Sequence, residues 1–119
     1  MHGGSFRRLS PIRSDWLERL INKLAVALAR VLGFRVRGED EQALTEIRAI
    51  TLELFGVPRR MLLSLDARTA LEVLSAPPLR AAALRLLEEE ASILRGQGKL
   101  ADADALDSWL LRTRSAATD

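Results

Sequence analysis

The chain has 119 residues, of which 48% are hydrophobic, and a formal net charge of +2 at pH 7. This length is typical of one domain, and the hydrophobic fraction suits a buried core and is too high for a disordered chain. Cysteine is absent, which excludes disulfides, thiolate catalysis and cysteine-ligated zinc.

The longest apolar run covers residues 24–29, far short of the roughly 20 apolar residues that span a bilayer. Charged and polar residues from Glu18 to Lys23 interrupt the segment that follows the first arginines, so we expect no signal peptide there. These features predict a cytoplasmic protein with no transmembrane segment.

Residues 1–13 are interpreted as a basic N-terminal arm, which carries Arg7, Arg8 and Arg13 among apolar residues. Such an arm can pack against the chain or a neighbouring subunit, stay disordered, or bind a protein partner. It can also bind a polyanion such as nucleic acid weakly, because each neutralised phosphate releases counterions. Three arginines and one aromatic residue are few for nucleic-acid recognition, so accessory polyanion binding is the alternative function.

The rest of the chain is predicted to form a single helical domain over residues 14–115, followed by a tail at 116–119. Apolar residues recur with helical spacing, and no segment alternates as a strand would. Five main helices follow in chain order, with a further short helix or turn at 58–63. They are expected at residues 15–32 with Ser14 as N-cap, 40–55, 67–74 with Asp66 as N-cap, 78–95 and 100–114.

Two stretches share a pattern around a glycine. Gly38 and Gly98 each lie between two predicted helices, and an alanine follows five positions later, at Ala43 and Ala103. Glycine permits a tight reversal, and the small residue lets two antiparallel helices approach closely. This spacing is typical of a tetratricopeptide hairpin.

The segments "GEDEQALTEIRAITLELFGVP" and "LEEEASILRGQGKLADADALDSWLL" resemble the hairpins of short bacterial tetratricopeptide-like helical proteins. The likeness covers roughly residues 14–114. It implies an all-α fold of antiparallel helical hairpins, a tetratricopeptide-like bundle of about five helices, and a role in interaction or assembly without catalytic residues. Three positions depart from the pattern, namely Arg30, Glu90 and Asp107.

The acidic clusters are the features of the sequence that most resemble a metal-binding or catalytic site. A calcium loop needs a glycine at its sixth position and an acid at its twelfth. If the loop began at Asp102, these positions would be Asp107 and Thr113, so neither requirement is met. On a helix Asp102 and Asp104 point about 200° apart, so we interpret these aspartates as surface charges. The three glutamates at 88–90 also point in different directions, and a di-iron site would need histidines that the domain lacks. We therefore expect no metal, cofactor or catalytic residue, and no enzyme.

The first long helix has an apolar face wider than one neighbouring helix covers. Another helix of the chain, a second copy of the chain, or a membrane surface could cover the remainder, although Asp15 and Glu18 disfavour an anionic membrane. We predict a non-catalytic protein–protein interaction or assembly module that forms a homodimer. The residues expected at the partner or dimer surface are Trp16, Leu17, Leu20 and Leu24.

Overall fold

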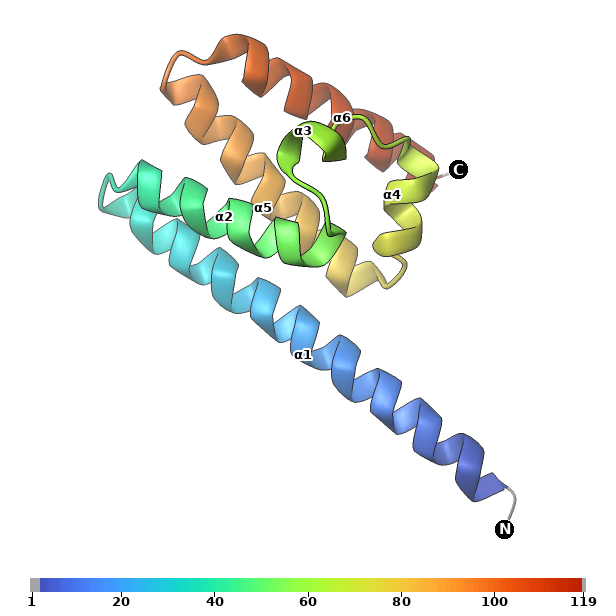
Figure 1. The fold of residues 1–119 in the computed structure, drawn as a ribbon. Helices are drawn as coiled ribbons and strands as arrows, with labels where there is room; N and C mark the ends of the chain where they lie inside the picture. The colour runs from blue at the N-terminus through green and yellow to red at the C-terminus, as the bar shows by residue number, and fades with distance from the viewer. Residues whose placement is uncertain (1–2, 119) are drawn as a thin grey trace.

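A computed structural model describes the backbone of residues 3–118 and the side chains of residues 15–118. Within this part all regular secondary structure is helical and there is no strand, which confirms the all-α prediction (Figure 1). The short segment after residue 58 forms a helix, so the described chain has six helices where five main ones were expected. They are α1 (Gly3–Val36), α2 (Asp40–Phe55), α3 (Arg59–Leu62), α4 (Ala67–Val73), α5 (Pro77–Gly96) and α6 (Leu100–Thr118).

Helix α1 is the main departure from the predicted boundaries. It begins at Gly3 and not at residue 15, so the expected role of Ser14 as N-cap is wrong: the residues before it are helical as well. Pro11 lacks a backbone N–H and removes one helical hydrogen bond, but this does not end the helix. With 34 residues α1 is about 51 Å long, and its first part extends past the other helices (Figure 1).

The two predicted hairpins are present and close with the same turn. Gly38 and Gly98 both have a left-handed backbone, with φ of 73° and 78°. In the first turn the Gly38 N–H donates to Arg35 O and the Glu39 N–H to Phe34 O, and the second turn repeats both bonds 60 residues later. The alanines five positions after each glycine, Ala43 and Ala103, are fully buried. Their small size brings the paired helices together.

Helix α5 lies at the centre of the packing. It pairs with α6 in the second hairpin, and it also contacts both α1 and α2 of the first hairpin. Helix α4 closes the other side by packing on α6. In this core the ring of Phe55 meets Trp109 edge-on, with centroids 6.2 Å apart. The core residues of α5 itself include Leu79, Ala83, Leu84, Leu86, Leu87, Ala91 and Ile93.

Replacing Gly98 by alanine should lower the free energy of unfolding by about 1–2 kcal/mol, because a side chain disfavours the left-handed backbone. Gly96 is a matched control, since it is the last residue of α5, has no left-handed backbone, and a Cβ would meet open space at either position. Gly96→Ala should leave stability unchanged or raise it by up to about 1 kcal/mol. Urea unfolding of both variants measures the difference in the free energy of unfolding. Equal changes in the two variants would show that the left-handed backbone at Gly98 does not contribute to stability.

Asp66 caps α4, as predicted, by accepting a 2.7 Å hydrogen bond from the Thr69 N–H. This backbone hydrogen bond, the Thr69 side chain and the charge of Arg68 hold the pKa of the Asp66 carboxyl below its usual value. A carboxyl whose pKa is lower when folded stabilises the fold above its unfolded pKa, and this contribution is lost as the pH falls through the folded pKa.

Asp66→Asn keeps an acceptor for the cap but cannot titrate. The wild-type chain should therefore lose stability relative to Asp66→Asn as the pH falls below about 4. Asp66→Ala should have a lower Tm than both at neutral pH, because it removes the acceptor. Thermal unfolding across a pH series tests this, and parallel curves for wild type and Asp66→Asn at acid pH would disprove it.

Candidate interaction surface

The four residues predicted to face a partner occupy different environments in α1. Leu24 is fully buried in the chain's own core, so it is not available to a partner. Leu17 and Leu20 are partly buried against the same core. Trp16 is 60% exposed. The structure therefore divides the predicted set into one core residue, two border residues and one exposed aromatic residue.

Trp16 is exposed because its neighbouring helix ends before reaching it. The Lys23 ammonium contacts the Glu53 carboxylate, which places Lys23 beside the last turn of α2. Trp16 precedes Lys23 by seven residues, about 10 Å along the helix axis. It therefore lies beyond the end of α2, whose last residue is Phe55.

A shallow groove of about 570 Å³ runs between α1 and α2, and we call it the α1–α2 groove. Val26 is the one large exposed apolar residue among those that line it, with 59% of its surface accessible. Apolar residues line the middle of the groove, with basic residues from α1 on one edge and acidic residues from α2 on the other. Its lining consists of Arg19, Asn22, Lys23, Val26, Ala27 and Arg30 from α1 and Glu46, Ala49, Ile50 and Glu53 from α2.

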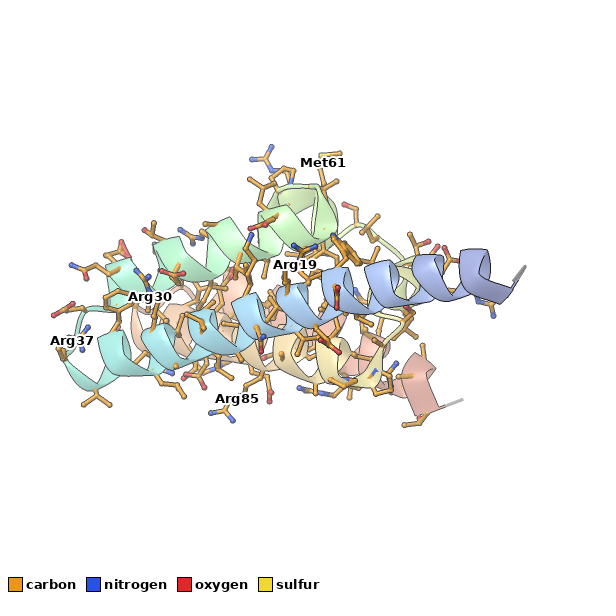
Figure 2. All side chains as sticks on the ribbon, turned by 90° about the horizontal axis from the view of Figure 1, so that it is seen from below. Arg19, Arg30, Arg37, Met61 and Arg85 are labelled. Atoms are coloured by element: carbon orange, nitrogen blue, oxygen red, sulfur yellow. The ribbon has the colours of Figure 1, made fainter. Side chains whose placement is uncertain are left out.

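Two ion pairs cross the groove, one on each side of Val26. Lys23 pairs with Glu53, and Arg30 Nε lies 3.2 Å from Glu46 Oε1. Figure 2 shows Arg19 and Arg30 on the side of α1 that faces α2, whereas Arg85 of α5 lies on the opposite side. Both pairs are largely open to water, and exposed pairs contribute only about 0–1 kcal/mol. They add little to the fold and leave charged groups accessible to a partner.

The three arginines of the N-terminal arm, Arg7, Arg8 and Arg13, have side chains outside the described residues. Among residues 3–118, none of the helices combines the length and apolar character that crossing a bilayer requires.

The three aspartates of α6 are exposed, as predicted, and Asp104 and Asp107 form ion pairs on the surface. Arg95 contacts Asp104 at 3.1 Å and also contacts Asp107. These two hydrogen bonds raise the pKa of Arg95, with that from Asp107 the larger cause. Over residues 15–118, no three acidic, histidine or cysteine side chains come close enough to hold a metal ion.

The three consecutive glutamates of α5 point in three directions, as expected on a helix. Glu88 pairs with Arg114 of α6, and Glu89 pairs with Arg35 of α1. Glu90 differs from both because it is only 1% exposed. The sequence predicted three different directions for these glutamates but did not indicate which of them is buried.

Glu90 is held by a buried hydrogen-bond cluster. The Arg59 guanidinium donates from Nε to both carboxylate oxygens, at 3.1 and 2.9 Å, and from Nη2 to Oε1 at 2.6 Å. The same Nη2 donates to Thr51 Oγ1, whose hydroxyl donates in turn to Ile47 O. A charge this deeply buried needs such partners to offset its lost hydration. The cluster links α2, α3 and α5, which is a structural role.

No protein-family model matches the chain, and neither the curated proteins nor the solved structures give a significant match.

Removing the buried carboxylate should be far more costly than removing its neighbour. Glu90→Ala leaves the charge of the largely buried Arg59 without its partner, and we expect it to lower the free energy of unfolding by about 3–5 kcal/mol. Glu88→Ala breaks an exposed pair with Arg114 and should cost no more than about 1 kcal/mol. Guanidinium unfolding of both variants measures this, and similar midpoints would show that the cluster contributes no more than a surface pair.

Proposed function

We propose that this chain is a non-catalytic helical interaction or assembly module that associates with a second copy of itself through the surface of α1. The observation that carries the proposal is the exposure of Trp16 on a helix that extends past its neighbours (Figure 1). Burying a large apolar side chain contributes roughly 1.5–3 kcal/mol. A partner that covers Trp16 and the exposed edges of Leu17 and Leu20 therefore gains from contact.

The framework that presents this surface is proposed to be tetratricopeptide-like. The two hairpins α1–α2 and α5–α6 share their turn hydrogen bonds and their buried alanines at a spacing of 60 residues. The first helix of the second hairpin packs on both helices of the first, as stacked hairpins do in helical repeat proteins. In such a framework each helix buries one face against neighbouring helices and leaves its other face accessible to a partner.

The oligomeric state tests this function directly. The purified wild-type chain should sediment as a concentration-dependent dimer. Trp16→Glu should weaken dimerisation by roughly tenfold or more, because a charge replaces a buried aromatic residue at the interface. Val36→Glu is a matched control, since Val36 is 88% exposed and lies at the other end of α1.

Circular dichroism should report the same helical content for both variants, which separates association from folding. A wild-type chain that remains a monomer at every concentration accessible to ultracentrifugation would overturn the proposal. Equal dimerisation by the two variants would exclude Trp16 from the surface.

A further inference from the structure

The charges of the α1–α2 groove lie in two opposed rows. The charged residues that α1 contributes to the groove are all cations, Arg19, Lys23 and Arg30, and those that α2 contributes are both carboxylates, Glu46 and Glu53. The two helices are antiparallel partners of one hairpin, so Lys23 faces Glu53 near one end and Arg30 faces Glu46 near the other. The groove therefore has a basic edge and an acidic edge with apolar residues between them.

The exposed aromatic residue of α1 lies on the same side of the helix as the cations of the groove. Trp16 precedes Arg19 by three positions and Lys23 by seven, a spacing that places all three on one side of a helix. On α2, Leu52 is half-exposed and lies three positions after Ala49, on the adjacent turn. Trp16, Val26 and Leu52 thus supply exposed apolar surface beside the charged rows.

We propose that a second copy of this chain docks on the α1–α2 groove, with the two-fold axis parallel to both helices and running along the groove. This inference rests on the proposed self-association and specifies its surface and symmetry. A half-turn about that axis carries α1 of each copy over α2 of the other. The basic edge of one copy then faces the acidic edge of its partner, so Lys23 faces the partner's Glu53 and Arg30 faces the partner's Glu46.

The charge pattern selects this axis over the other face-to-face arrangement. An axis perpendicular to the helices would set α1 against the partner's α1, which brings Lys23 and Arg30 against cations of the same kind. Like charges brought together at an interface oppose association, whereas the parallel axis gives every carboxylate a second cation. Two-fold symmetry also makes each favourable contact occur twice.

Charge reversal on the full-length chain tests the contact between copies. Lys23→Glu places a carboxylate opposite the partner's Glu53, and Glu53→Lys places a cation opposite the partner's Lys23. Each variant alone should dimerise roughly tenfold or more weakly than wild type, because the repulsion occurs twice. An equimolar mixture of the two should form heterodimers with near wild-type affinity, because the reversed charges then face each other.

The mixture distinguishes contacts between chains from those within a chain. Each single variant also loses its internal Lys23–Glu53 pair, and mixing cannot restore that pair. The double variant Lys23→Glu, Glu53→Lys restores the internal pair and the pairs between chains together. It should fold and dimerise like wild type, and a double variant that folds but dimerises weakly would contradict the proposed pairing between copies.

A substitution in the middle of the groove gives an independent readout. Val26→Glu should weaken dimerisation strongly, while Val36→Glu should not. If the wild-type chain dimerises but the mixture gains no affinity and Val26→Glu behaves like Val36→Glu, the groove is not the interface, and the proposed self-association uses another surface. A wild-type chain that stays monomeric, or whose groove binds a helix of another protein in place of a second copy, overturns this inference.

Discussion

The buried contact between Arg59 and Glu90 is the interaction on which the arrangement of the helices depends most. Helix α5 packs against α1, α2 and α6, and this central position leaves Glu90 without access to water. The carboxylate is compatible with the core because Arg59, from the short α3 that follows α2, reaches it with three hydrogen bonds. The same guanidinium binds Thr51 of α2, so one side chain fixes the first hairpin, the connector and the second hairpin to one another.

Much of the fold could be predicted because the local signals agree with the tertiary structure. Helix α2 occupies the expected residues 40–55, Asp66 caps α4, and both glycine turns adopt the left-handed backbone that their position requires. These features depend only on residues a few positions apart in the chain, so they can be predicted from the local sequence. The start of α1 was missed because polar and proline residues before Ser14 suggest a boundary that the helix passes through.

Features that depend on distant elements could not be predicted. Helical spacing places Glu88, Glu89 and Glu90 in three directions, but only the position of α3 determines which of them is buried. Asp107 departs from the repeat for a related reason: α6 buries Leu106 and Trp109 and packs on α4 as well as α5, which leaves Asp107 on the exposed side with Arg95. The predicted partner residues include both buried and exposed side chains for the same reason. The exposure of Trp16 and the burial of Leu24 depend on where α2 ends, which the sequence of α1 does not contain.

The two glycine turns have a consequence for how the chain reaches its native state. Each turn connects its helices through a few residues, so the contacts within a hairpin are close in sequence. Such short-range contacts form quickly because little chain entropy is lost in closing them. We therefore expect each half to contain its own folding nucleus, and the hydrogen bond from Arg59 to Glu90, 31 positions later, to join the halves after the hairpins form.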